Sequence, residues 1–145
     1  MTDTTQTERS LVLVKPDGYR RGLTGEVLRR IEAKGYTLAA LAVLTPTREQ
    51  LGAHYAEHDG KPFYEPLLEF MSSGPVTAAI IEGQGCVAGF RSLAGATDPT
   101  GAAPGTIRGD LGRDWGVAVQ QNIVHGSDAR ESAEQEIAIW FPDHA

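Results

Sequence analysis

The sequence contains a single cysteine, Cys86, among its 145 residues. One cysteine cannot form an intrachain disulfide, and it cannot supply a zinc cluster of several thiolates. Residues 1–8 are polar and rich in threonine, and they lack the apolar core of a signal peptide. These absences argue against secretion, and we predict a cytoplasmic protein.

Long hydrophobic runs are also absent, since no apolar segment approaches the ~18 residues that a membrane-spanning helix needs. Positive charge is scarce as well. The chain has 13 lysines and arginines against 19 aspartates and glutamates, a formal net charge of −6. Nucleic acids and anionic membranes bind to basic surfaces, so we expect neither as a stable partner. A small anion needs only a few converging cationic side chains and is not excluded.

The common phosphate-binding motifs are missing too. No P-loop pattern occurs, and Gly83-Gln84-Gly85 lacks the continuation that a dinucleotide-binding fingerprint requires. Any nucleotide chemistry in this chain must therefore use a different design.

The composition is that of a folded globular protein, with 41% hydrophobic and 22% charged residues. A chain of 145 residues fits one domain, which we expect to span residues 1–145. A domain of this mass buries roughly two-thirds of the surface of its unfolded chain. That burial supports a hydrophobic core without disulfide or metal crosslinks.

Four apolar segments are typical of strands, and they alternate with segments of helical spacing. The order of these elements predicts an α+β fold. The simplest match is a ferredoxin-like βαββαβ sandwich, in which helices cover one face of an antiparallel sheet. The predicted strands are residues 11–14, 36–44, 76–81 and 122–125.

Helix starts are indicated by two patterns that resemble capping boxes, Thr47 with Gln50 and Asp128 with Glu131. Residues 15–18 are typical of a turn. Residues 95–116 are rich in glycine and proline, and a loop of that length is unusual unless it has a function. Helices are expected at 23–35, from 47 past 55, at 62–71, at 87–93 and from 128 toward 137.

His125 follows a short apolar segment and precedes the small residues Gly126 and Ser127, which leave an imidazole accessible. A histidine nucleophile needs one nitrogen free to attack and the other held by an acceptor. Ser127, Asp128 and Glu136 are the nearby candidates for that support. The alternative is an ordinary structural histidine, which is also the preferred interpretation of His54, His58 and His144.

Three cationic residues, Lys15, Arg91 and Arg108, follow the first predicted strand or flank the long loop, which also contains Thr97. Arginine binds phosphate in a bidentate manner, and lysine acts as a point charge. Together they would suit a polyphosphate, although each alone is more often a solvated surface charge.

Two segments carry a resemblance to a known family: Pro104-Gly105-Thr106-Ile107-Arg108-Gly109-Asp110, and Asn122-Ile123-Val124-His125-Gly126-Ser127-Asp128. With further motifs in family order, the chain is similar to the nucleoside diphosphate kinases over nearly its whole length. The combination is far more specific than any single glycine pattern. The further motifs are residues 8–18, 21–26, 54–55, 61–64, 73–76 and 95–99.

The resemblance implies that His125 accepts a γ-phosphoryl group on Nδ1 and passes it to a second nucleotide in ping-pong fashion. It also implies that Glu136 holds the other imidazole nitrogen and that Ser127 supports Glu136. Tyr55 would lie beside the transferring group, and Phe63 would stack on the base, a contact that every base can make. The remaining implied nucleotide contacts are Lys15, Arg91, Thr97 and Arg108 to the phosphates, and Asn122 with Lys15 to the sugar.

The resemblance further implies nucleoside triphosphates and diphosphates as substrates, with Mg²⁺ held mainly by their phosphates. It also implies a homo-oligomer, a tetramer or a hexamer, with the loop around Pro99 in subunit contacts. The chain departs from the family pattern in the longer spacing between Arg108 and Asn122, whose extra length lies near residues 112–116. Asp98 and Gln121 also replace residues common in the family.

Two other functions are compatible with parts of the sequence. One is a regulatory protein that binds nucleotides without transferring phosphate, which the presence of His125, Lys15 and Arg108 disfavours. The other is a nucleic-acid-binding protein, which the net charge of −6 disfavours.

Overall fold

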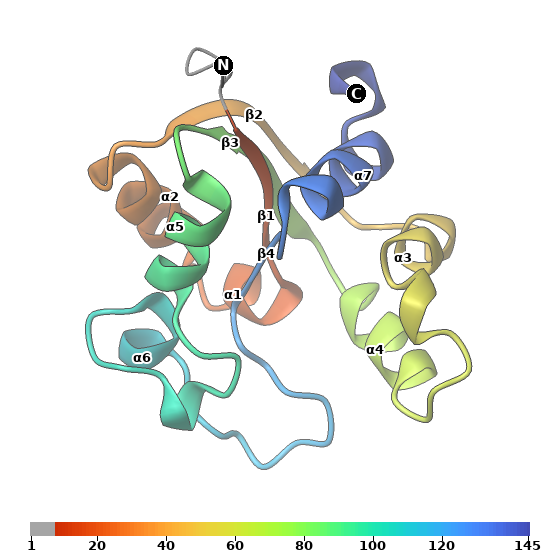
Figure 1. Ribbon diagram of the computed structural model, residues 1–145. Helices are drawn as coiled ribbons and strands as arrows, with labels where there is room; N and C mark the ends of the chain where they lie inside the picture. Colours follow the sequence, from red (N-terminus) through yellow and green to blue (C-terminus); the bar gives the residue numbers. More distant parts are fainter. Residues whose placement is uncertain (1–7) are drawn as a thin grey trace.

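The computed structural model describes residues 8–145, so the prediction of no signal peptide in residues 1–7 lies outside the described part. Within that part, four strands form one antiparallel sheet in the order β2-β3-β1-β4 (Figure 1). With α2 and α5 as the crossing helices, the order β1-α2-β2-β3-α5-β4 confirms the predicted ferredoxin-like α+β fold. The strands are β1 (Arg9–Val14), β2 (Thr37–Leu44), β3 (Val76–Glu82) and β4 (Val124–Gly126).

Strand β1 lies at the centre of the sheet, and its side chains are buried on both faces. Val12 and Val14 pack with α2 (Thr24–Ala33), α5 (Cys86–Ala94) and α6 (Ile107–Leu111). Leu11 and Leu13 pack with α3 (Arg48–His54), α4 (Tyr64–Met71) and α7 (Arg130–Trp140). Figure 1 shows these two helix groups on opposite sides of the sheet.

The prediction of helices over one face was therefore incomplete. The crossing helices α2 and α5 do share one face, but α3, α4 and α7 cover the other. The physical reason lies in β1, whose Leu-Val-Leu-Val run is apolar at every position rather than at every second one. Such a strand loses stability unless both faces are covered.

Two short helices lie in segments that the sequence predicted as irregular. Residues 15–18 contribute to α1 (Pro16–Arg20), where Pro16 occupies the first helical position and needs no N–H partner. The long loop contains α6, which begins where the Thr106 side chain accepts a hydrogen bond from the Gly109 N–H. One-turn helices show no periodic apolar pattern, which explains why the sequence did not predict them.

The predicted helix starts have different outcomes. The capping box of Thr47 and Gln50 is present at the start of α3 and confirms that prediction. The predicted capping box of Asp128 and Glu131 was wrong, because α7 begins after Ala129 without a side-chain cap. The predicted strand at 122–125 is also displaced, since β4 begins only at Val124.

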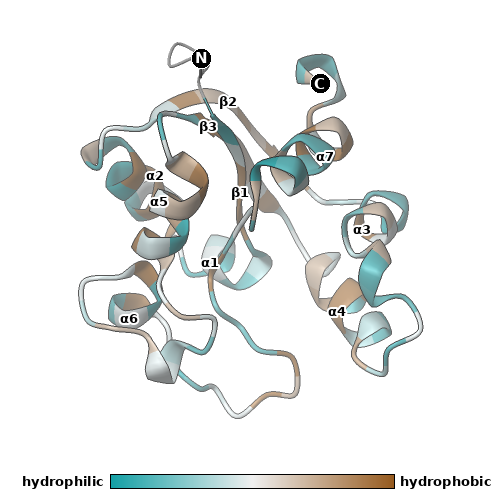
Figure 2. Cartoon of the chain, viewed as in Figure 1, coloured by the Kyte–Doolittle hydropathy of each residue, from teal (hydrophilic) through white to brown (hydrophobic). Residues whose placement is uncertain are grey.

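Hydrophobic colouring follows the strands and helix α5 in Figure 2, and hydrophilic colouring marks the outward turns of α2 and α7. This distribution matches the two buried clusters on the faces of the sheet. Over residues 8–145, every helix is too short or too polar to cross a lipid bilayer.

Candidate active site

A cavity of about 490 Å³ lies between α3, α5, α7 and strand β4. A volume of this size is typical of a small-molecule site. Of the ten residues that the sequence singled out, only Phe63 and Ser127 are absent from its lining. The eight that line it are Lys15, Tyr55, Arg91, Thr97, Arg108, Asn122, His125 and Glu136.

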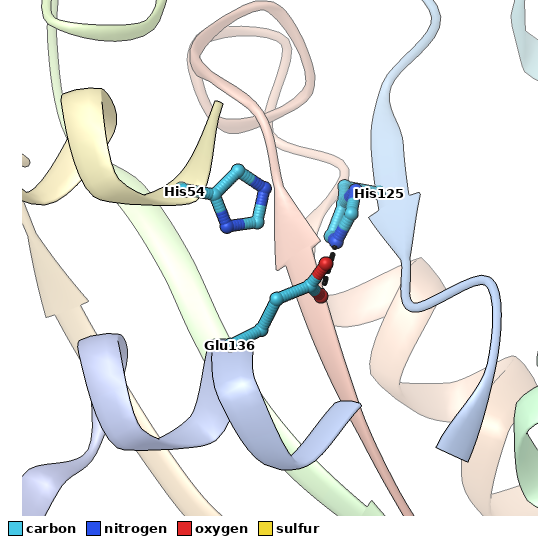
Figure 3. A group of neighbouring side chains, drawn as sticks. All are labelled: His54, His125 and Glu136. Carbon is cyan, nitrogen blue, oxygen red and sulfur yellow. Dashed lines mark hydrogen bonds and ion pairs between the residues drawn. The ribbon is translucent and has the colours of Figure 1, made fainter. Parts of the chain in front are cut away.

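His125 is held at one nitrogen only. Its Nε2 lies 2.8 Å from Oε1 of Glu136, which extends from α7 toward β4 (Figure 3). No residue in the described part of the chain forms a hydrogen bond with Nδ1 of His125. An ionised carboxylate accepts the proton on Nε2, so the lone pair of the neutral ring is on Nδ1. The imidazole therefore presents an unprotonated nitrogen as a potential nucleophile.

Glu136 is fixed from a second direction by the buried residue Ser127. The Ser127 hydroxyl donates to Oε1 of Glu136 at 2.8 Å and accepts from the backbone N–H of Leu11 at 3.1 Å. Burial pushes the pKa of Glu136 upward, but His125, with smaller contributions from His54 and the Ser127 hydroxyl, outweighs burial and holds the pKa below its usual value. The carboxylate is therefore ionised at neutral pH.

Lys15 and Asn122 form a pair at the cavity wall. The Lys15 Nζ donates to Oδ1 of Asn122 at 2.9 Å, and Nδ2 of Asn122 donates to the backbone carbonyl of Thr97 at 3.0 Å. Burial, followed by the neighbouring Arg108, lowers the pKa of Lys15 to about 8. Because an ammonium group has three donors, Lys15 keeps two for a ligand.

Arg108 bonds to three backbone carbonyls, those of Gly95 at 2.9 Å, Asn122 at 3.1 Å and Val124 at 2.6 Å. Burial and the neighbouring Arg91 lower its pKa to about 10, so it remains charged at neutral pH. A guanidinium has five N–H donors, so two remain for an anion. Arg108 thus braces the chain before His125 and also places positive charge in the cavity.

Tyr55 and Phe63 differ in their exposure. The Tyr55 hydroxyl is buried without a hydrogen-bond partner among the described residues, and burial raises its pKa. It is therefore a neutral donor without a partner at the cavity. Phe63 is 48% exposed and lies outside the lining, but its ring centroid is 5.2 Å from that of His58, which belongs to the lining. Its ring is therefore exposed and lies next to a residue of the cavity lining.

His54 also lines the cavity, although the sequence favoured an ordinary structural role for this histidine. Its ring meets the ring of His125 edge to face, with centroids 4.7 Å apart (Figure 3). Its Nδ1 accepts the indole N–H of Trp140 at 3.0 Å. Burial and the nearby His125 lower the pKa of His54 to about 3, so this imidazole is neutral. The motif at residues 54–55 did not reveal these contacts, because His125 and Trp140 are remote from His54 in sequence.

Among residues 8–145, one group offers three side chains close enough to share a metal ion: His54, His125 and Glu136. Coordination through Nε2 of His54 would place a proton on Nδ1, facing the indole N–H of Trp140. The N–H groups of His54 and Trp140 would then face each other, and the hydrogen bond between them would be lost. This nitrogen-rich group also differs from the oxygen donors that Mg²⁺ prefers, so we assign no metal to it.

The segment that departs from the family pattern lies at a second cavity, of about 410 Å³. Asp98 and Gln121 line this cavity and not the one around His125. The ring of Trp115 in the same segment packs under the guanidinium groups of Arg21 and Arg113, at 5.3 and 4.8 Å. None of residues 112–116 lines the cavity around His125.

An imidazole with a free nitrogen and several cations in one cavity suit chemistry on a phosphate group, because arginine and lysine bind phosphate and histidine can accept it. The comparisons with known proteins identify the family to which the chain belongs. The family model "Nucleoside diphosphate kinase" matches residues 8–145. The chain belongs to the nucleoside diphosphate kinase family, which confirms the resemblance and makes it a phosphotransferase acting on nucleotides.

Individual relatives agree with this assignment. A nucleoside diphosphate kinase of Streptomyces coelicolor is 58% identical over 137 residues, which cover 94% of this chain and 97% of that protein. One from Mycobacterium tuberculosis is also 58% identical, over 94% of this chain and 98% of its own. The solved structure of a halophilic nucleoside diphosphate kinase from Halobacterium salinarum in complex with CDP has a TM-score of 0.89. It is 44% identical and covers 96% of this chain and 90% of that one.

Proposed function

We propose that this chain transfers a γ-phosphoryl group from a nucleoside triphosphate to a nucleoside diphosphate through phospho-His125. The observation that carries the proposal is the asymmetric environment of this imidazole, with Nε2 held by Glu136 and Nδ1 free in the cavity. A regulatory protein that only binds nucleotides has no need for a nucleophile held in this way.

In the first half-reaction, Nδ1 of His125 forms a bond to the γ-phosphorus while the bond to the β,γ-bridging oxygen breaks. The nucleoside diphosphate leaves with that oxygen, and the proton on Nε2 stays between His125 and Glu136. A second diphosphate then attacks the phosphorus from the same cavity. One phosphoanhydride replaces another, so the equilibrium constant lies near unity. The order of events is ping-pong.

The substrate contacts follow from the lining. Lys15, Arg91 and Arg108 would hold the phosphates with Thr97, and the unpartnered Tyr55 hydroxyl would donate to the transferring group. Phe63 at the mouth would stack on the base, which favours broad base tolerance. Asn122 with Lys15 would reach the sugar. The CDP complex of the Halobacterium relative supports a nucleotide in this fold.

Mg²⁺ would arrive with the nucleotide. The carboxylates that line the cavity are Glu57, Asp128 and Glu136, and Glu136 is already committed to His125 and Ser127. The described residues thus form no cage of several oxygen ligands, which fits an ion held by phosphates and water. When bound, the ion would neutralise phosphate charge.

The decisive experiment incubates the protein with Mg²⁺ and ATP labelled at the γ-phosphate, and then isolates the protein. We expect an acid-labile label on the protein, which unlabelled UDP removes completely as labelled UTP. A protein that binds ATP but acquires no label would contradict the transfer mechanism. It would support the regulatory alternative instead.

The lowered pKa of Lys15 predicts a pH dependence of nucleotide affinity. The protonated amine attracts phosphate, so the affinity for ADP should fall as the pH rises through about 8. Losing one charge-assisted hydrogen bond costs roughly 1.5–3 kcal/mol, or about 10- to 100-fold in Kd. Titration calorimetry at pH 7 and pH 9.5 measures the change, and Lys15→Gln should remove most of it. An equal pH dependence in Lys15→Gln would refute the assignment.

A homo-oligomer is supported by the outer edge of the sheet. Within the described part of the chain, strand β2 has a sheet neighbour on one side only, and it exposes Leu41 at 52% and Val43 at 57%. An uncovered apolar edge strand promotes pairing with another chain. We propose that a second copy covers β2. Pro99 is buried in its own chain, so its loop would contribute to subunit contacts through its neighbours.

The double variant Leu41→Lys with Val43→Lys tests this assembly. We expect its mass by light scattering to fall toward that of one chain, 15.5 kDa, at micromolar concentration. Glu131→Lys on the exposed surface of α7 is the matched control and should keep the mass of the parent protein. A double variant with unchanged mass would exclude β2 as the interface.

We further propose that residues 1–145 act as one nucleoside diphosphate kinase domain in the cytoplasm. The single cysteine Cys86, which is buried, supports a reducing compartment. The acidic charge supports nucleotides rather than nucleic acid as partners.

A further inference from the structure

Ile123, two residues before the nucleophile, has a left-handed backbone with φ of +73°. It is the one residue other than glycine with this conformation in the described part of the chain. A β-branched residue rarely adopts a positive φ, because the conformation is strained and persists only where the surrounding structure enforces it. Contacts around Ile123 must therefore hold its backbone in this conformation.

Two hydrogen bonds hold the backbone of Ile123, one to the carboxylate of Asp17 and one from the backbone of Lys15. Oδ2 of Asp17 accepts the N–H of Ile123 at 3.0 Å, and the N–H of Lys15 donates to the carbonyl of Ile123 at 2.7 Å. Gly18 makes the approach possible, because a Cβ there would lie 2.9 Å from Cγ2 of Ile123. The helix α1 that the sequence did not predict is thus built against this residue.

The bend at Ile123 separates two functional side chains. Asn122 precedes it and faces Lys15 and Thr97, while β4 starts after it and carries His125 in register with Leu13. Arg108 binds the carbonyls on both sides of the bend, those of Asn122 and Val124. A change in the backbone at Ile123 would therefore move His125 relative to the cations of the cavity.

Asp17 forms no ion pair with any described residue, although its charge acts to raise the pKa of Lys15 and of Arg108 against the effect of their burial. It is only 3% exposed, and its Oδ1 is buried without a hydrogen-bond partner among the described residues. Leaving a buried acceptor unpaired costs free energy. The contact with Ile123 is the one side-chain hydrogen bond found for this carboxylate.

We propose that Asp17 is a positioning residue for phosphoryl transfer, which enforces the left-handed backbone of Ile123 and thereby fixes Nδ1 of His125 relative to Lys15 and Arg108. The proposal rests on the function proposed above. It assigns Asp17 an effect on the transfer step rather than on nucleotide binding, since Asp17 does not line the cavity. A misplacement of about 1 Å between reacting groups can cost about 100-fold in rate.

The experiment compares Asp17→Ala with Asp17→Asn in single-turnover phosphorylation of His125 at saturating ATP. We expect Asp17→Ala to be about 10- to 100-fold slower, with KM changed less than about threefold. Asp17→Asn keeps an oxygen that accepts the N–H of Ile123, so its rate should stay within about threefold of the parent. A purely electrostatic role would make the two variants equally slow, and that result would overturn the proposal.

A second test removes the strain. Glycine adopts a positive φ without support, so Ile123→Gly should reduce the cost of Asp17→Ala at least severalfold relative to the same substitution in the parent. Circular dichroism and thermal unfolding establish that each variant is folded. If Asp17→Ala or Ile123→Gly does not fold, Asp17→Asn alone decides. A phosphorylation rate of Asp17→Asn more than about tenfold below the parent overturns the proposal. A retained rate in Asp17→Asn, with an unfolded Asp17→Ala, supports the hydrogen bond to Ile123 as the required feature. If the parent protein itself acquires no label, the proposed function fails rather than the role of Asp17.

Discussion

His125→Gln is expected to abolish phosphoryl transfer, with kcat at least about 10³-fold below that of the parent. Glutamine fills a similar space but offers no nucleophilic nitrogen, so no covalent intermediate can form at residue 125. Nucleotide binding should survive, because Lys15, Arg91 and Arg108 are unchanged and line the same cavity. A coupled assay gives kcat, and calorimetry with ADP gives the affinity, which should stay within about threefold.

The matched control is His144→Gln, since His144 is exposed and lies outside the cavity. This variant should retain full activity and full labelling by γ-labelled ATP. If His125→Gln still acquired an acid-labile label, another residue would be the phosphoryl acceptor. If it lost nucleotide affinity as well, its defect would extend beyond the nucleophile.

Glu136→Gln is expected to reduce kcat by about 100-fold or more, because the amide can donate to Nε2 of His125 as well as accept from it. A donated hydrogen bond would favour the tautomer with its proton on Nδ1, which cannot attack phosphorus. In the parent, the ionised carboxylate lies 2.8 Å from Nε2, where it would fix the reactive tautomer and stabilise the positive charge that develops on the ring. Single-turnover phosphorylation at saturating ATP measures the transfer step directly.

Glu131→Gln is the control on the same helix, since Glu131 is exposed and does not line the cavity. Its phosphorylation rate should equal that of the parent. For Glu136→Gln, KM should change much less than kcat, because the carboxylate bonds to His125 and Ser127 rather than to a predicted nucleotide contact. A rate within about threefold of the parent would exclude tautomer control by Glu136.

The order of the strands and the ferredoxin-like topology could be predicted because they follow from local patterns. Apolar runs such as 11–14 and the helical spacing after Leu23 are visible in a single sequence. The second helical layer could not be predicted with the same ease, because coverage of the other face by α3, α4 and α7 depends on contacts between distant segments. The one-turn helices α1 and α6 are too short to show a period.

The motifs brought out several residues that line the cavity, such as Lys15, Arg108 and His125. His54 and Asp17 were not predicted, although both lie within or beside segments that carry the resemblance. The ring of His54 accepts a hydrogen bond from Trp140, which lies 86 positions away. The carboxylate of Asp17 accepts one from the backbone N–H of Ile123, which lies 106 positions away. No local pattern of residue types reveals either contact.

The sequence by itself determined the chemistry that is available: an acidic single chain without crosslinks, an imidazole followed by small residues, and three cations near a glycine-rich loop. The tertiary structure decided which nitrogen of His125 is free, because that depends on Glu136 reaching back from α7 to β4. It also decided that Arg108 both braces the backbone and charges the cavity. Residue types fix what groups can react, whereas distances of a few ångströms between remote segments fix which of them do.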